Sequence, residues 1–171
     1  MSFMTFQHFF AHSFGCSVFC SYFCRMNVEG YSKSYVLSML ALGVMLLFTG
    51  GMIYVLYRPQ TLLLFHVAGG LGMTDIIEQW RQMATAWHPA AFTVYCLPAG
   101  LWALSYVLIV GTLTQGLPTI RRWVAVASIP LLGIASEVMQ ALSIIPGTFD
   151  WADLALYVLP LIAYATINNK Q

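Results

Sequence analysis

The chain contains four long apolar segments, and the first of them, from Ser34 to Tyr57, carries no charged residue. The hydrocarbon core of a bilayer is about 30 Å thick, so a helix that crosses it needs about 20 mostly apolar residues. Of the 171 residues, 60% are hydrophobic and 8% are charged, whereas soluble domains hold roughly 45–50% and about 25%. The sequence therefore predicts an all-α integral membrane protein.

The boundaries of the apolar segments predict where the helices cross. The first segment ends where Arg58 and Pro59 combine an interfacial cation with a residue that stops helices. The second contains Pro98, and the third carries Glu137 and Gln140. We predict four transmembrane helices that form one membrane domain from 34 to 171, over residues 34–57, 90–113, 123–145 and 150–167.

Two adjacent glycines, Gly50 and Gly51, lie inside the first segment. Small residues let neighbouring membrane helices approach closely, and they are also found at mild kinks. The sequence leaves these roles, and simple tolerance of glycine, open.

A different pattern lies between the first two spans. Residues 60–73 include an apolar stretch that is too short to cross a bilayer. Further on the pattern is amphipathic, and Asp75 followed by Glu78 predicts a capping box at the start of a helix. The apolar face of this helix includes two tryptophans and consists of Ile76, Ile77, Trp80, Met83, Ala84 and Trp87. We predict an outward interfacial amphipathic helix in the membrane surface.

Basic residues predict the orientation, because they favour the cytoplasmic side of a membrane. With four spans, the two termini and the middle loop share one side and hold Arg25, Lys33, Arg121, Arg122 and Lys170. The first and third loops, on the other side, hold Arg58 and Arg81. We predict a multi-pass protein of the cell membrane with both termini cytoplasmic and with the 143–149 turn outside.

Residues 1–33 are predicted to form an N-terminal arm, which has no Lys or Arg before Arg25. The arm lacks the positive start of a secretory signal. Zinc-binding residue types recur at every fourth position, as His8, His12, Cys16, Cys20 and Cys24. Zinc signatures normally contain tighter pairs, so we predict no metal site. Translation from Met26 is an alternative that leaves most of the arm outside the native product.

Three of the six acidic residues, Glu137, Asp150 and Asp153, lie near the turn that joins the last two spans. Glu137 and Gln140 share one face of a helix, and a short turn brings the helices on either side of it together. We predict an outward-facing polar zone of Glu137, Gln140, Asp150 and Asp153. An ionisable residue inside a span is costly and is a functional hypothesis by default.

Structural roles compete with a functional role at these positions. Asp150 fits the N-cap of the last helix, with Asp153 in the first turn, where a carboxylate meets the positive end of the helix dipole. Glu137 and Gln140 can instead join neighbouring helices by hydrogen bonds. The sequence does not decide between these roles.

The same residues resemble a family pattern. Glu137, Gln140, Pro146-Gly147, Asp150 and Asp153 form a sequence similar to the core of the VanZ-like family of small bacterial membrane proteins. The family usually has Arg and Asn where this chain has Thr148 and Tyr157. The resemblance implies a role in the cell envelope, since the family's namesake is linked to resistance to the glycopeptide antibiotic teicoplanin, and it implies no known reaction.

Three functions agree with these features. The first is a non-enzymatic envelope protein whose polar zone binds a ligand, a lipid-linked molecule or a membrane protein partner. The second is an intramembrane enzyme acting on a lipid-linked substrate, with Glu137 as base and Asp150 or Asp153 orienting it. The third is an ion or proton pathway. We expect the bilayer itself as a partner, no nucleic acid and no cofactor, because the net charge is +1 and no HExxH or Gly-x-Ser-x-Gly motif is present.

Overall fold

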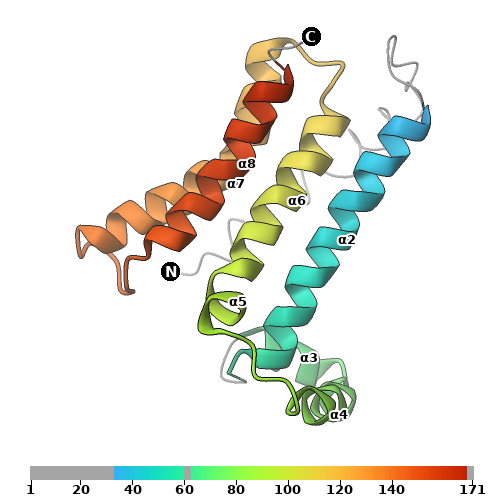
Figure 1. Cartoon of the computed structure of the whole chain (residues 1–171), viewed down its shortest axis with the longest axis vertical. Coiled ribbons are helices and arrows are strands. Elements are labelled where there is room, and N and C mark those ends of the chain that lie inside the picture. The colour runs from blue at the N-terminus through green and yellow to red at the C-terminus, as the bar shows by residue number, and fades with distance from the viewer. Residues whose placement is uncertain (1–32, 60–62, 169–171) are drawn as a thin grey trace.

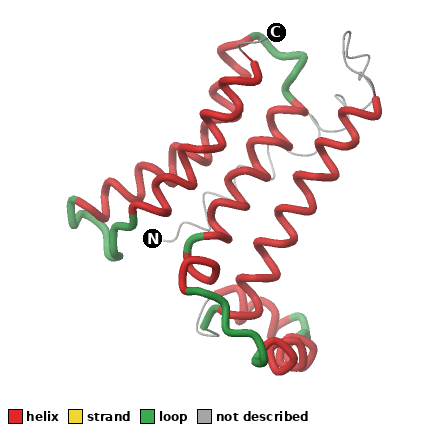
Figure 2. Tube along the Cα trace, in the orientation of Figure 1, coloured by secondary structure: helices red, strands yellow, loops and turns green. Residues whose placement is uncertain are grey.

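The structure is a computed structural model that describes residues 33–59 and 63–168, and the secondary structure of this part is helical (Figures 1 and 2). The all-α prediction is confirmed for these residues. The N-terminal arm, apart from Lys33, and its His/Cys pattern lie outside them. The helices in the described part are α2 (Lys33–Tyr57), α3 (Leu63–Gly70), α4 (Thr74–Ala84), α5 (Ala91–Tyr95), α6 (Leu97–Leu113), α7 (Thr119–Ala141) and α8 (Trp151–Asn168).

Helix α6 lies at the centre of the bundle. It packs against α2 on one side and against α7 and α8 on the other (Figure 1). The chain reverses direction from α2 to α6, from α6 to α7 and from α7 to α8 (Figure 1). The start of α2 and the end of α8 therefore lie at the same end of the bundle, while α3, α4 and α5 lie toward the other.

The contact between α2 and α6 depends on small residues. Gly43 and Gly50 are buried on one face of α2. A Cβ atom at Gly50 would lie 2.7 Å from Nε1 of Trp102, whereas a Cβ atom at Gly51 would meet nothing within 4 Å. Ser105 of α6 donates a hydrogen bond of 2.7 Å to the carbonyl oxygen of Gly43. Of the roles that the sequence left open, close approach of a neighbouring helix is found at Gly50 and not at Gly51.

The segment predicted as one helix over 90–113 is broken at Cys96. Helix α5 ends at Tyr95 and α6 begins at Leu97. Pro98 lies in the first turn of α6, where a residue without a backbone N–H is tolerated. Because proline has no N–H, it cannot donate the helical hydrogen bond to the carbonyl oxygen of Val94, four residues earlier. The break brings the Cys96 side chain, which is 6% exposed, toward the end of the α7–α8 turn.

Helices α7 and α8 form an antiparallel pair. A Cβ atom at Gly133 would lie 2.6 Å from the ring of Tyr157, so this glycine lets the two helices approach closely. At the other end of the pair, the Arg122 side chain donates a hydrogen bond to the Asn168 side chain, and the Trp123 ring meets the Tyr164 ring edge-on at 5.1 Å.

Helix α7 covers 119–141 and not the predicted 123–145. Its start follows Pro118, whose fixed φ suits the position before a first helical turn. Its end is a Schellman motif, in which Ser143 has a φ of 56°. The N–H groups of Ser143 and Ile144 donate to the carbonyl oxygens of Gln140 and Met139, both at 2.9 Å. The turn therefore begins earlier than the Pro-Gly pair.

Helix α4 begins one residue before the predicted capping box. Its N-cap is Met73, which makes no side-chain capping hydrogen bond, so the prediction of Asp75 as N-cap of a capping box with Glu78 is wrong. Asp75 still lies in the first turn, where a carboxylate interacts favourably with the helix dipole. Ile77 is buried, while Trp80 and Met83 are exposed.

Three helices in the described part, α2, α7 and α8, are long and apolar enough to cross a membrane. Helix α6 is also apolar but has 17 residues. Few residues of the three longer helices are buried inside the protein, and large side chains such as Leu37, Met45 and Phe48 of α2 are more than half exposed. Exposed apolar side chains on these helices are compatible with a protein that lies in a membrane.

Candidate functional site

The predicted polar zone lies where the end of α7, the start of α8 and the α5–α6 break meet. Glu137 belongs to the inward face of α7, together with Val126, Pro130 and Gly133, because helical residues three and four apart lie on one side. Its side chain is 6% exposed. The structure thus places an ionisable residue in the packed interior of an apolar bundle.

Asp150 connects three elements. Its backbone N–H donates to Oε2 of Glu137 at 3.2 Å. Its Oδ1 accepts a hydrogen bond of 2.8 Å from the N–H of Ala152, and its carbonyl oxygen accepts one of 3.1 Å from Leu154. These contacts confirm that Asp150 is the N-cap of α8. Its second carboxylate oxygen, Oδ2, lies 3.5 Å from the thiol of Cys96.

Cys96 is a member of this cluster that the sequence analysis missed. The thiol is the donor to Asp150, and Asp153 also lies close enough to interact with it. Cys96 is separated from Asp150 by 54 positions in the sequence. The one local sequence signal for this contact was Pro98, because a proline inside an apolar segment predicts a break in the helix. The break lies at Cys96 and directs its side chain toward Asp150.

Asp153 and Tyr157 extend the cluster along α8. The Oδ1 atom of Asp153 is buried and has no hydrogen-bond partner among the described residues. Tyr157, one turn further on, lies near both Asp153 and Glu137. Its ring covers Gly133, one turn before Glu137 on α7. Tyr157, which stands where the VanZ-like pattern has Asn, therefore borders the zone between α7 and α8.

Gln140 lies against the turn. A Cβ atom at Gly147 would lie 2.7 Å from the carboxamide carbon of Gln140, so the loop passes directly over this side chain. Gly147 has a φ of 145°, which glycine adopts readily. The structure brings Glu137, Asp150, Asp153 and Cys96 together, while Gln140 supports the loop that leads to them.

The two basic residues of the first loop direct their guanidinium groups to backbone oxygens. Arg81 donates to the carbonyl oxygens of Val55 and Arg58, and Arg58 donates to that of Tyr95. The charged side chains of the polar zone are the carboxylates of Glu137, Asp150 and Asp153, which accept hydrogen bonds. Among the residues that the structure describes, no group of three or more His, Cys, Asp and Glu side chains is arranged to hold a metal ion.

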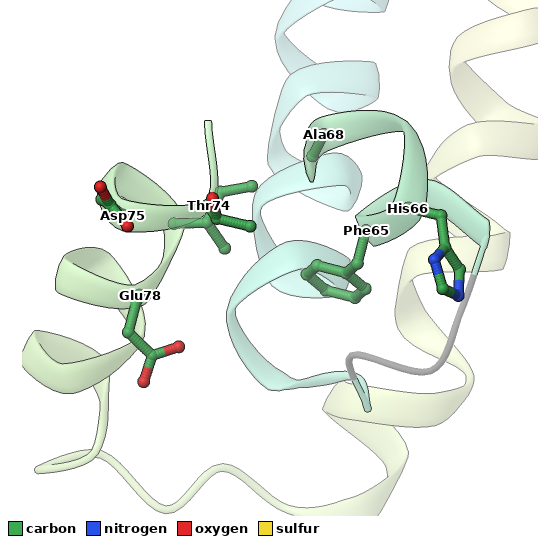
Figure 3. A pocket seen from close by; sticks show the side chains of 7 residues that line it. Phe65, His66, Ala68, Thr74, Asp75 and Glu78 are labelled. Carbon is green, nitrogen blue, oxygen red and sulfur yellow. The ribbon is translucent and has the colours of Figure 1, made fainter. Parts of the chain in front are cut away.

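A hollow lies between α3 and α4, away from the polar zone (Figure 3). It has a volume of about 330 Å³ and is lined by Phe65, His66, Ala68, Thr74, Asp75, Ile77 and Glu78. Figure 3 shows that His66 and Asp75 point away from one another. The polar groups around this hollow do not converge on one point, so the better candidate site is the polar zone.

The fold and the zone define a class: a helical protein with three apolar helices long enough to cross a membrane and an acidic cluster in which Glu137 is buried. Comparison with family models, with curated proteins and with solved structures finds no match to this chain.

Proposed function

We propose that the chain is a multi-pass membrane protein of the bacterial cell envelope whose polar zone binds the head group of a lipid or lipid-linked molecule. The observation that carries the proposal is Glu137, which is 6% exposed and accepts a hydrogen bond from the backbone N–H of Asp150. The Asp150 carboxylate in turn accepts a hydrogen bond from the thiol of Cys96, which also lies near Asp153. Ionisable residues inside spans mark functional sites more often than structural ones. The resemblance to the VanZ-like family supports an envelope role.

The proposed arrangement has four spans, with α5 and α6 together forming the second. Helix α6 alone would reach about 26 Å at 1.5 Å per residue, so it needs the turns of α5 to cross a core of about 30 Å. Both termini lie in the cytoplasm, and α4 lies in the outer membrane surface with Trp80 and Met83 toward lipid. The exposed side chains of Trp87 and Trp151 suit the head-group region.

The chemistry of the zone favours a ligand that donates hydrogen bonds. Carboxylates accept hydrogen bonds, and the buried Oδ1 of Asp153 has no partner among the described residues. An ammonium, hydroxyl or amide group would satisfy such an oxygen, and a cation would also lower the repulsion among neighbouring carboxylates. A lipid-borne ligand can reach the zone from the bilayer, because the zone lies between helices with apolar outer faces.

The test compares two zwitterionic lipids. The purified protein is reconstituted in nanodiscs that contain phosphatidylethanolamine and phosphatidylcholine, and native mass spectrometry counts the lipid that each variant retains. The parent chain should prefer phosphatidylethanolamine, because only its ammonium carries N–H donors. Glu137→Gln should lower this preference about tenfold, a change that corresponds to about 1.4 kcal/mol. Its thermal unfolding should match that of the parent.

Two further variants separate binding from stability. Asp150→Asn should weaken the preference but keep the N-cap of α8, whereas Asp150→Ala should also lower stability by about 1 kcal/mol. Asp75→Asn removes an exposed carboxylate from α4; it should leave the lipid preference unchanged and should change stability by at most about 0.5 kcal/mol, from its lost interaction with the helix dipole. Equal retention of the two lipids by the parent chain, or a preference that survives Glu137→Gln, contradicts the proposal.

A further inference from the structure

A continuous series of contacts runs from the surface helix α4 to the polar zone, through residues that lie far apart in the sequence. It begins at Arg81, whose Nη1 donates to the carbonyl oxygens of Val55 at 2.7 Å and Arg58 at 2.8 Å. These carbonyls lie at the C-terminal end of α2, where the last backbone oxygens have no partner within the helix. Arg81 therefore fastens α4 to α2.

The second link is Arg58. While its carbonyl oxygen accepts from Arg81, its Nη2 donates to the carbonyl oxygen of Tyr95 at 3.0 Å. Its guanidinium also lies over two aromatic rings, 5.4 Å from the centre of Tyr54 and 4.9 Å from that of Tyr95. Cation–π contacts of this kind add to the hydrogen bond. Arg58 thus holds the end of α5 against the end of α2.

The third link follows directly in the chain. Tyr95 precedes Cys96, whose thiol donates to Oδ2 of Asp150, and the N–H of Asp150 donates to Glu137. Each step fixes the next element: α4 to α2, α2 to α5, α5 to the start of α8, and α8 to α7. These discrete contacts form a route by which a shift of α4 would reach the carboxylates.

We propose that Arg81 and Arg58 are positioning residues that couple the seating of α4 in the membrane surface to the geometry of the polar zone. Helix α4 exposes Ile76, Trp80 and Met83, so its position responds to the lipid around it. The effect on ligand binding rests on the proposed function, but the coupling itself does not. Coupling between sites is established by measuring both ends, since a row of contacts alone does not prove it.

The thiol of Cys96 reports on the far end of the series, because it is buried when the contacts are made. Cys16, Cys20 and Cys24 are replaced by Ser, which leaves Cys96 as the single cysteine of the chain. The rate of its reaction with N-ethylmaleimide is measured by intact mass in nanodiscs. Arg81→Met should raise this rate about tenfold, the scale of one lost charge-assisted hydrogen bond.

Conservative and matched variants separate coupling from a general loss of packing. Arg81→Lys should keep the slow rate, because both hydrogen bonds come from a single nitrogen that an ammonium can replace. Gln82→Met, at an exposed neighbouring position of α4, should also keep it. Arg58→Met should raise the rate as Arg81→Met does, and the double variant should rise less than the product of the two effects.

A second reporter detects global loosening. Ser105→Cys, in a chain whose native cysteines are all replaced by Ser, places a thiol at the buried α2–α6 contact, outside the series. Its reaction rate should not change with Arg81→Met. An unchanged rate at Cys96 in Arg81→Met overturns the proposal, and so does an equal rise at both reporters. Either result is independent of whether the polar zone binds a lipid.

Discussion

Asp150 shows how far a single residue can be predicted from sequence. Its role as N-cap follows from local rules, because an Asp before an apolar helix offers an oxygen to the free N–H groups of the first turn. The contact between its backbone N–H and Glu137 was predicted only as a general proximity across the turn. The thiol of Cys96 was not predicted, since no local rule relates residues 54 positions apart.

Arg58 was interpreted from sequence as an interfacial cation at the end of the first span, and Arg58 and Arg81 together as charges that define a membrane side. Their contacts with the ends of α2 and α5 depend on where α3 and α4 place the chain after its first span. Tertiary placement of this kind has no signature in spacing or composition. The sequence signal that could have suggested it is Arg58 at a helix end, where cations commonly bond to the last carbonyl oxygens.

The prediction at the residue scale concerns the stability of a variant at Gly147. Gly147→Ala should destabilise the protein by about 1–3 kcal/mol, because a side chain at a φ of 145° is strained. The new Cβ atom would also lie 2.7 Å from the carboxamide carbon of Gln140. Thermal unfolding in nanodiscs measures the change. Gly116→Ala, in the loop before α7, meets nothing within 4 Å and should stay within about 0.5 kcal/mol of the parent; similar losses for both variants would contradict this account of the turn.

At the scale of elements, the sequence located the apolar helices well and their ends less well. Helix α2 was predicted over 34–57 and covers Lys33–Tyr57, where a charge at each end limits the apolar segment. Helix α7 is displaced by four residues at each end, from 123–145 to 119–141. The Schellman motif at Ser143 ends it, although serine at a positive φ is not a usual helix-stop signal.

The prediction at this scale concerns the contact between α2 and α6 and its contribution to stability. Gly50→Ala should lower stability by about 1–3 kcal/mol, because the added carbon would lie 2.7 Å from the Trp102 ring nitrogen. Gly51→Ala makes the same chemical change one residue later and should be neutral or raise stability by about 0.5–1 kcal/mol, as alanine favours the helix. Equal effects in thermal unfolding would mean that the two helices do not pack through Gly50.

At the scale of the whole molecule, α2, α6, α7 and α8 run in alternating directions along the chain (Figure 1). The start of α7, with Arg121 and Arg122, lies at the same end of the bundle as the start of α2 (Figure 1). The turn at 143–149 lies toward the other end of α7. This arrangement could be predicted from the sequence, because it depends on the positions of the apolar segments and on the lengths of the loops between them. The membrane side that each end faces depends on the distribution of charge.

The most direct test of the account is the side of the membrane that each end of α7 faces. All four native cysteines are replaced by Ser, and one cysteine is introduced by Thr148→Cys in the turn next to the polar zone or by Gly116→Cys in the loop before α7. Intact bacterial cells are treated with a membrane-impermeant maleimide. We expect labelling at position 148 in intact cells and at position 116 only after lysis. Labelling of both positions in intact cells, of neither, or of position 116 alone would contradict a membrane-spanning protein with an outward polar zone.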